Sequence, residues 1–464
     1  LGTDNETTIE ITDASTGTAA AADINTIVAK INANSSTASV TVNANITTIT
    51  GTASAVKSVY TSATAGDVTG VGNENITITG ETTSSASDIN AIVLATSSTV
   101  NTSTNVTTIS GSLTNIQSFQ SNVASGDIVS GLNYNVVITD TGTLVAQDLL
   151  NLIGPGAGKT FGTINIADVT KVTGTETEIT NFLAKVASNT ISADAAINID
   201  VYDVNTPVTT VTAANLNTFD DYTLGTVAAP QATTVTGTVS AIAEAVTSSG
   251  ISVADDINAT FDTIAVATDQ NVTDINTVIA NTTGTITGTV TGTPERMADI
   301  TLSTASVSDA VKNLTVNAVG SGDLTALNLS EATTLTLNGA TTLPDSDADM
   351  SPTVDFGSQA VTLSGNINLN SITTSNLGTF AVGSNTLTGS AAKLTGVTVT
   401  GAGTTAVTAL HLTLGADLRG IDTTTTTAAF DGNVTFTGFL DGAVVTVGDG
   451  FTMTAAYSVL NGEE

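Results

Sequence analysis

The sequence predicts a β-rich repeat protein in which solenoid-like strand/helix repeats precede an all-β solenoid or sandwich. Three observations predict this fold class. Two short anchor motifs recur at nearly constant spacing, strand-like and helix-like patterns alternate between the anchors, and only short strand-like segments recur beyond residue 295. We therefore expect five strand/helix repeats of about 60 residues, each with two half-units, in residues 1–295 and a strand-rich region in residues 296–464.

The repeat is carried by two anchors. The first is Asp or Asn, then Ile or Leu, then Asn, with one looser copy in which Leu150 replaces the final Asn. The second is Thr or Ser followed by Gly and a helix-like pattern. Units of this kind bury their apolar faces by stacking on their neighbours. The first anchor begins at Asp23, Asp88, Asp148, Asn215 and Asp274, and the second has its glycine at Gly51, Gly111, Gly174 and Gly237.

Within one repeat, residues 75–80 alternate apolar and polar side chains like a half-buried strand. Residues 84–95 begin with Ser and Asp and carry apolar residues at helical spacing. A strand at 106–110 and a helix at 113–119 follow. The next copy shows the same order at 136–139, 149–153, 164–166 and 179–186. Strand, helix, strand, helix predicts parallel pairing with right-handed crossovers.

Beyond residues 294–296 the helical periodicity largely vanishes after 307–311, and short strands bounded by Gly, Asn or Asp take over. Their uneven spacing leaves both a parallel solenoid and a sandwich open. The expected strands are 314–316, 324–329, 334–338, 361–364, 394–400, 407–414, 434–437 and 444–447.

Charge and composition exclude several classes of function. The chain has 42 Asp and Glu but only 9 Lys and Arg, for a formal net charge of −33. Because nine cationic side chains cannot neutralise a phosphate backbone, we expect no nucleic-acid partner. No apolar run is long enough to span a bilayer, so we expect no membrane insertion. The absence of Cys excludes disulfides and thiolate metal sites.

The acidic residues predict calcium sites. Asp345, Asp347 and Asp349 alternate in a loop between expected strands, which is a ligand pattern that Ca²⁺ accepts. The pair Asp220 and Asp221 is a second candidate metal site. Further acidic candidates are Asp255, Asp256, Asp441 and Asp449. A chain with this uncompensated charge has a physical reason to bind divalent cations, because they relieve its self-repulsion.

Catalytic motifs are weak, and we expect no enzyme. Residues 154–160 end in Gly-Lys-Thr, but Ile153 stands where a phosphate-binding loop needs its first Gly, and the segment follows a helical pattern rather than a strand. The single histidine, His411, lies in a strand-like segment, and no Gly-x-Ser-x-Gly nucleophile motif is present.

The composition is rich in Thr, Ala, Gly, Val and Asn, with no Cys, few Lys and strand-like segments such as Thr-Leu-Thr-Leu-Asn-Gly at 334–339. In these features the sequence resembles bacterial surface-layer proteins. The resemblance implies an extracellular protein of the cell surface that self-assembles through repeated contacts and cations. We therefore predict a structural homopolymer, a layer, tube or filament cemented by Ca²⁺, with 8–11 and 457–460 as its polymerising strand edges. The alternative is an adhesin or tail-fibre-like module that binds a cell-surface glycan or host surface; Thr-x-Thr phrases also leave an ice-binding solenoid open.

Overall fold

The computed structural model describes residues 8–12, 17–34, 38–103, 105–131, 133–153, 161–266, 268–297, 299–300, 312–319, 322–323, 334–338, 341–343, 353–440 and 442–461. It forms two compact units, Leu1–Val208 with Thr218–Pro230 and Thr209–Asn217 with Gln231–Glu464. The boundary at residue 295 stays a prediction about domain organisation. In the described residues, all helices of eight residues or more end at or before residue 281.

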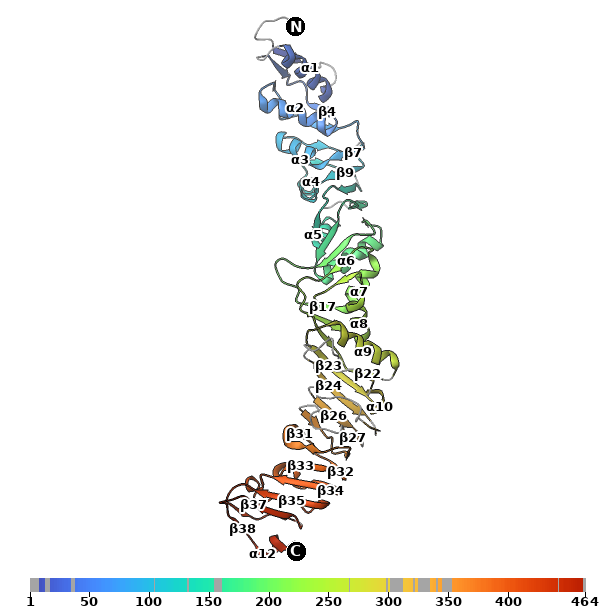
Figure 1. Cartoon of the computed structure of the whole chain (residues 1–464). Coiled ribbons are helices and arrows are strands. Elements are labelled where there is room, and N and C mark those ends of the chain that lie inside the picture. The colour runs from blue at the N-terminus through green and yellow to red at the C-terminus, as the bar shows by residue number, and fades with distance from the viewer. Residues whose placement is uncertain are drawn as a thin grey trace. The chain divides into compact units, whose positions relative to one another are not determined.

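The first unit consists of repeated parallel strand/helix units, which confirms the predicted repeat (Figure 1). One repeat contains β6 (Asn75–Ile78), β7 (Thr83–Ser85) and α3 (Ala86–Ala95), then β9 (Thr108–Gly111) and α4 (Leu113–Ser125). The predicted strands and helices of this repeat and of the next are confirmed, although α4, α5 (Ala146–Ile153) and α6 (Glu176–Ala187) are longer than predicted and residues 84–85 of the predicted helix belong to β7.

The remaining elements of these units follow the same order along the chain. The other helices are α1 Ala21–Asn34, α2 Ala53–Ala65, α5 Ala146–Ile153, α6 Glu176–Ala187, α7 Ala213–Tyr222, α8 Val239–Thr247 and α9 Asp269–Asn281. The other strands up to residue 228 are β1 Thr8–Ile11, β2 Thr18–Ala20, β3 Ser39–Val42, β4 Thr48–Gly51, β5 Val68–Thr69, β8 Val100–Asn101, β10 Ile128–Val129, β11 Asn135–Ile138, β12 Thr143–Val145, β13 Ile164–Asn165, β14 Lys171–Gly174, β15 Ile191–Ser192, β16 Asn198–Val201, β17 Thr210–Thr212 and β18 Val227–Ala228.

The strands of the first unit pair in parallel between successive half-units. The sheet orders are β1-β3-β5, β10-β8-β6-β4-β2 and β15-β13-β11-β9-β7, and a further sheet runs β12-β14-β16-β18. The last three sheets begin at β2, β7 and β12, whose first residues are Thr18, Thr83 and Thr143, so each of the last two begins one repeat after the sheet before it. The repeat period seen in the sequence is therefore the interval at which a new sheet starts.

Local sequence explains where a helix such as α4 begins and ends. The side chain of Ser112 accepts a hydrogen bond from Asn115 N at the first turn, which is the usual N-cap. Leu113, Ile116 and Phe119 lie on one face and are buried. Gly126 follows in the left-handed conformation, with φ of 90°, and ends the helix.

The first anchor motif joins two helices. Its Ile or Leu is fully buried in each copy, and in the four copies that have the Asn its side chain donates a hydrogen bond to a backbone carbonyl of the next half-unit. In three copies the acceptor is the third residue of the following helix: Asn25 to Ala55 at 2.8 Å, Asn90 to Asn115 at 2.9 Å and Asn217 to Ala241 at 3.0 Å. A carbonyl in a helix has a second lone pair for such a bond. The anchor is therefore a link between neighbouring units.

The second anchor is a close approach between units. Its glycine ends a strand, and a Cβ there would lie close to the Cβ of the alanine that begins the preceding helix. The pairs are Gly51 with Ala21, Gly111 with Ala86 and Gly174 with Ala146, each at 3.2 Å, and Gly237 with Ala213 at 3.5 Å. All four alanines are fully buried. Gly and Ala recur at these positions because larger side chains would push the units apart.

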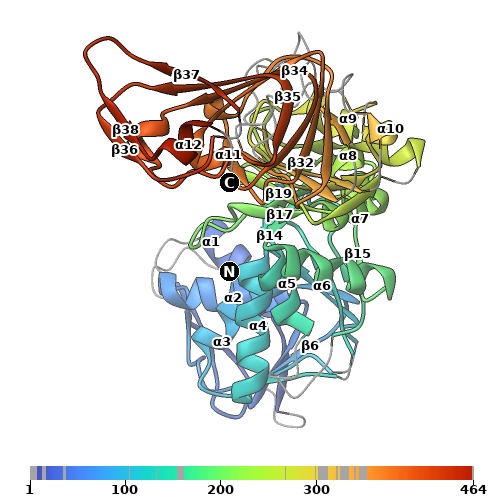
Figure 2. The same cartoon turned by 90° about the horizontal axis from the view of Figure 1, so that it is seen from below.

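In the second unit, strand/helix units lead into a strand-rich region. The sheet β17-β19-β21-β23 continues through β24, β26, β28 and β31, and a second sheet runs β25-β27-β29-β32-β34-β33-β30, with β35 pairing β34 and β37. The pairings between the described strands of this region are parallel, and Figure 2 shows β34, β35 and β37 side by side. The strands are β19 Thr234–Gly237, β20 Ile251–Ser252, β21 Asn258–Phe261, β22 Ile264–Val266, β23 Ile286–Gly292, β24 Lys312–Val319, β25 Gly322–Asp323, β26 Thr334–Asn338, β27 Thr341–Leu343, β28 Thr353–Asp355, β29 Ala360–Leu363, β30 Ile367–Asn368, β31 Thr373–Ser375, β32 Thr379–Gly383, β33 Thr386–Ser390, β34 Thr398–Thr408, β35 Ile421–Phe430, β36 Val434–Phe436, β37 Val444–Val447 and β38 Met453–Ala455.

The predicted strands of this region are confirmed in part. Those at 334–338 and 444–447 coincide with β26 and β37, and those at 314–316, 361–364 and 434–437 overlap strands. The prediction at 407–414 is wrong beyond Thr408, because Leu410–Leu412 forms the 3₁₀ turn η4 after Ala409, whose φ is 51°. The prediction at 394–400 begins too early, since Ala391–Leu394 is the short helix α11. Residues 324–329 and 307–311 lie outside the described residues.

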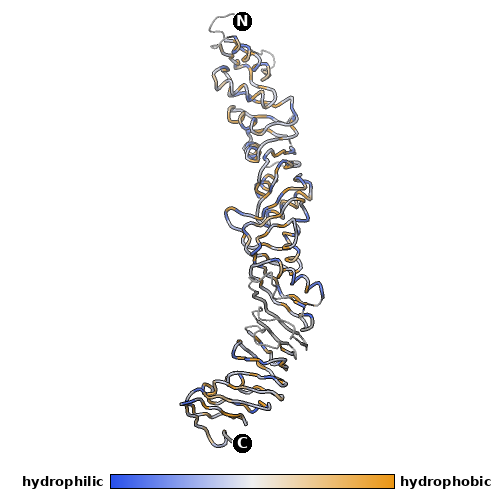
Figure 3. The backbone as a smooth tube through the Cα atoms, in the orientation of Figure 1, coloured by the Kyte–Doolittle hydropathy of each residue, from blue (hydrophilic) through white to orange (hydrophobic). Residues whose placement is uncertain are grey.

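Buried and exposed residues alternate along strands such as β29 and β32, and Figure 3 shows orange segments recurring along the tube of this region. In the strand-rich region the interior holds aromatic pairs. Phe356 and Phe380 meet edge-to-face at 5.3 Å between ring centroids, and Phe430 and Phe436 at 5.5 Å.

Candidate assembly surfaces

Most of the main predicted metal ligands lie where the structure gives no test of them. Asp345, Asp347 and Asp349 lie outside the described residues, as does Asp441. Asp220 and Asp221 are adjacent on α7, where consecutive side chains point in different directions. Within the described ranges, no three His, Cys, Asp or Glu side chains are grouped so that they could hold a metal ion. Calcium binding stays a prediction.

Two carboxylates instead cap helices of the preceding half-unit. Glu81 Oε1 accepts a hydrogen bond from Ala53 N at 3.0 Å, at the start of α2, and Asp140 Oδ2 accepts one from Leu113 N at 2.7 Å, at the start of α4. Both satisfy an unpaired amide and place negative charge at the positive end of a helix dipole. The sequence signal was present, because acidic residues follow β6 and β11 at the repeat spacing, but their partners are not local.

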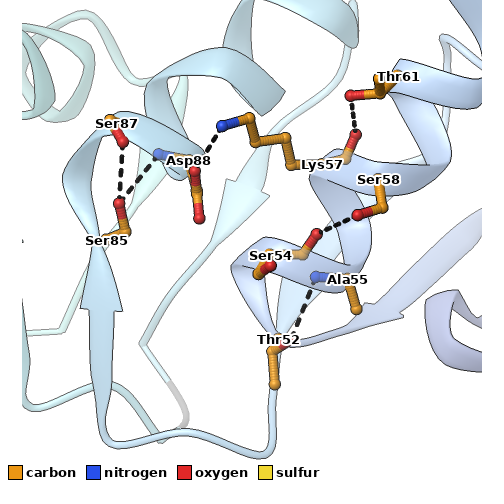
Figure 4. A network of polar contacts seen from close by, with 9 residues as sticks. All are labelled: Thr52, Ser54, Ala55, Lys57, Ser58, Thr61, Ser85, Ser87 and Asp88. Carbon is orange, nitrogen blue, oxygen red and sulfur yellow. Dashed lines mark hydrogen bonds and ion pairs between the residues drawn. The ribbon is translucent and has the colours of Figure 1, made fainter.

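Several of the few Lys and Arg side chains form ion pairs within the chain. Figure 4 shows Lys57 of α2 reaching Asp88 at the start of α3, with Nζ and Oδ1 2.7 Å apart. Lys171 pairs with Asp200 at 2.8 Å and Arg419 with Asp417 at 2.9 Å. Such partly exposed pairs add little stability each. Most of the 42 acidic residues have no cation to pair with, so the surface stays strongly negative.

Neither weak catalytic motif gains support. Residues 154–160 lie outside the described residues. His411 lies in η4 rather than in a strand, beside Gly432, where a Cβ would lie 2.7 Å from the imidazole Cδ2. The backbone at Gly432 therefore packs directly against the imidazole of His411.

A cavity of about 360 Å³ opens beside α5 and α6 of the first unit. Three carboxylates line it, but two of them already serve the local backbone. Glu178 Oε2 accepts a hydrogen bond from Thr175 N in the capping box of α6, and Asp203 Oδ1 accepts one from Asn205 N. The third is Asp148.

Exposed apolar side chains gather late in the chain. Of the 13 large hydrophobic residues that are exposed in the described ranges, seven fall within residues 412–457. Soluble monomers rarely leave many large apolar groups exposed in one region without a binding role. The seven are Leu412, Leu414, Phe439, Val444, Val447, Phe451 and Tyr457.

Several strands, including β37 and β1, have a partner on one side only within the described residues. β37 pairs with β35 and β1 pairs with β3, each in parallel. The predicted edge at 8–11 is thus a strand edge. The prediction of a strand edge at 457–460 is wrong, because Tyr457–Asn461 forms the short helix α12.

Core-facing positions on these two strands are only partly covered. Val447 pairs with Phe430, which is fully buried, yet Val447 itself is 38% exposed. On β1, Ile9 and Ile11 are half-buried, whereas their partners Val40 and Val42 on β3 are buried. The apolar interior is therefore open beside β37 and beside β1.

The part of the chain that the structure describes contains no helix long and apolar enough to cross a membrane. No family model, curated protein or solved structure matches the chain.

Proposed function

We propose that this chain is a structural, non-catalytic protein of the cell exterior that self-assembles into a surface layer, tube or filament. The observation that carries the proposal is the pair of strand edges at β1 and β37, where apolar positions that are buried one strand further in are left partly exposed. An unpaired parallel edge with uncovered apolar side chains is a template for another chain.

The proposal includes a finer description of the fold: both regions are parallel β-solenoids, and the strand-rich region is not a sandwich. Its support is the parallel register between strands one turn apart, such as Phe380 with Val399 and Val399 with Ile421. Sandwiches are built mainly from antiparallel strands. A stack of turns leaves an open face at each end, and polymerisation covers it.

The proposal also includes calcium as the cement between copies. Its support is electrostatic, because copies with a formal charge of −33 repel one another unless counter-ions gather between them. The candidate ligands remain the carboxylates at 345, 347 and 349 and the pair Asp220 and Asp221.

Negative-stain electron microscopy of the purified chain tests the proposal, at about 5–10 mM Ca²⁺, which is ample for weak extracellular sites of about 10⁻⁴–10⁻³ M, and again with chelator. We expect ordered sheets, tubes or fibres that dissolve on chelation. Polymers that survive chelation remove calcium from the proposal and leave self-assembly. Monodisperse particles under both conditions overturn self-assembly, and binding to immobilised cell-surface glycans becomes the next measurement.

A further inference from the structure

We propose that the parallel ladder continues from one copy to the next, with β37 of one copy pairing directly with β1 of another. This inference rests on the proposed self-assembly and names the two surfaces that carry it. The occupant of the open edge of β37 is thus a second copy of this chain.

The two edges are complementary in direction. β37 pairs on one side with the earlier strand β35, and its open side is the side on which a later strand would lie. β1 pairs with the later strand β3, and its open side is where an earlier strand would lie. A β1 strand placed against β37 therefore continues the order of the ladder without reversing it.

The backbone hydrogen-bonding groups match as well. Gly448 N donates to Phe430 O of β35 at 2.8 Å, so by alternation along a strand the N–H groups of Val445 and Val447 point to the open side. Ile11 O accepts from Asn43 N at 3.0 Å on the side of β3, so the groups of Glu10 point to the open side of β1. A parallel ladder that aligns Val445 with Ile9 and Val447 with Ile11 uses both sets.

The same register aligns the side chains. Val445 and Val447 are paired with the buried Ala428 and Phe430, so they occupy core-facing positions. Ile9 and Ile11 are paired with the buried Val40 and Val42 and occupy core-facing positions too.

The strand that already pairs with β1 in the chain contains the same three residues as β37. β1 pairs in the chain with Val-Thr-Val at 40–42, and β37 contains the same triplet at 445–447. No residue of β37 is charged, so Glu10 meets no like charge on the strand opposite. A contact that uses two different surfaces is heterologous, and unless its rotation closes a ring it produces filaments.

Two proline variants of the full chain test the pairing. Val447→Pro removes an N–H on the open side of β37, and Glu10→Pro removes one on the open side of β1; proline is tolerated at an edge where the N–H has no partner. We expect each variant alone to stay monomeric in sedimentation velocity under conditions where the unchanged chain polymerises. Mixed in equal amounts they should form a species of twice the monomer mass and nothing larger, because each retains one intact edge.

A second pair of variants guards against misfolding. Val447→Asp places a charge at the open core and should raise the concentration needed for polymerisation at least tenfold. Val444→Asp makes the same change on the same strand, at a side chain that is 60% exposed and faces away from the core, and should leave that concentration unchanged. Circular dichroism must match the unchanged chain in all four variants.

The outcomes separate this inference from the proposed function. Polymers from either proline variant alone, or monomers only in the mixture, overturn the β37–β1 pairing while self-assembly of the unchanged chain stands. An unchanged chain that stays monomeric with and without calcium overturns both.

Discussion

The strand/helix region and the strand-rich region advance by different numbers of residues per turn of the chain. Thr48 of β4 is aligned with Asn75 of β6, 27 residues later, whereas Thr379 of β32 is aligned with Thr398 of β34, 19 residues later. The 13-residue helix α2 is about 20 Å long, a length that about six residues span as a strand. Replacing the helix by a strand therefore saves about seven residues per turn, close to the difference between the two registers.

The corners of the two regions are built alike. A Cβ on Gly284, in the strand/helix region, would lie 2.5 Å from Ile257 O, and a Cβ on Gly403, in the strand-rich region, would lie 2.0 Å from Asn385 O. In each case the carbonyl belongs to the preceding turn. The corner chemistry is thus shared, and what differs is the element that joins the corners.

The contacts that hold neighbouring turns together also differ. Side-chain amides such as Asn25 and Asn90 link successive helices. In the strand-rich region aromatic contacts such as Phe356 with Phe380 join turns, and side-chain amides such as Asn385, whose Nδ2 donates to Leu363 O at 2.9 Å, join them as well. Both regions therefore use directional hydrogen bonds between turns, and what differs is that those of the first region link helices.

The largest expected effect comes from truncating buried rings. Phe182→Ala in α6 and Phe380→Ala in β32 each remove a fully buried side chain and should cost about 3–5 kcal/mol in the free energy of unfolding. Hydrogen exchange should rise mainly in the unit that contains the substitution, because the turns contact only their neighbours. Equal loss of protection in both units would show that the two regions unfold together, contrary to this expectation.

A smaller effect is expected at a corner. Gly403→Ala should destabilise the strand-rich region by about 1–3 kcal/mol in urea unfolding, because the added Cβ meets backbone that cannot move freely. Gly415→Ala is the control, since a Cβ there meets nothing within 4 Å, and it should stay within about 0.5 kcal/mol. Similar losses of unfolding free energy in both variants would contradict the close approach of the corner glycine to the preceding turn.

The helix links should contribute less. Asn90→Leu, which copies the residue found at Leu150, removes a donated bond to Asn115 O and an accepted bond of 3.0 Å from Asn122. We expect a loss of about 1–2 kcal/mol in thermal or urea unfolding. The reference change is Asn32→Leu in α1, whose side chain is exposed and bonds only to Asp67 at 3.0 Å. If Asn90→Leu left the free energy of unfolding unchanged, the helices would be held together by packing and not by these hydrogen bonds.

The smallest effect is a pH dependence in the strand-rich region. The Gly357 N–H and the Asn376 side chain lower the pKa of Asp355, and the Arg419 guanidinium lowers the pKa of Asp417. Because the folded pKa values are depressed, this stability is present above the unfolded value of about 3.9 and is lost as pH falls through the folded values. Asp355→Asn and Asp417→Asn should each flatten the acid limb of the unfolding free energy by less than about 1 kcal/mol; an unchanged acid limb in both would contradict this assignment.

The sequence pattern did not predict some strands of the strand-rich region. β35 contains the run Thr423–Thr427, which lacks the large apolar residues that mark a strand, yet Thr426 is buried and the run pairs along β34. The neighbouring ladder imposes the extended conformation there. Conversely, 457–460 has strand-like residues but no neighbour that pairs with it, and it is helical.

The repeat period, the order of strands and helices in the first unit, the helix caps and the acidity of the chain could be read from local sequence, because each follows from residues near one another. The folded chain was needed to show that the anchor Asn bridges two helices, that the anchor Gly faces a buried Ala, that Glu81 and Asp140 cap helices, and that the cores beside β1 and β37 are open. These contacts join residues 24 to 30 positions apart. Their partners are set by the register between turns, and that register forms only when the units stack.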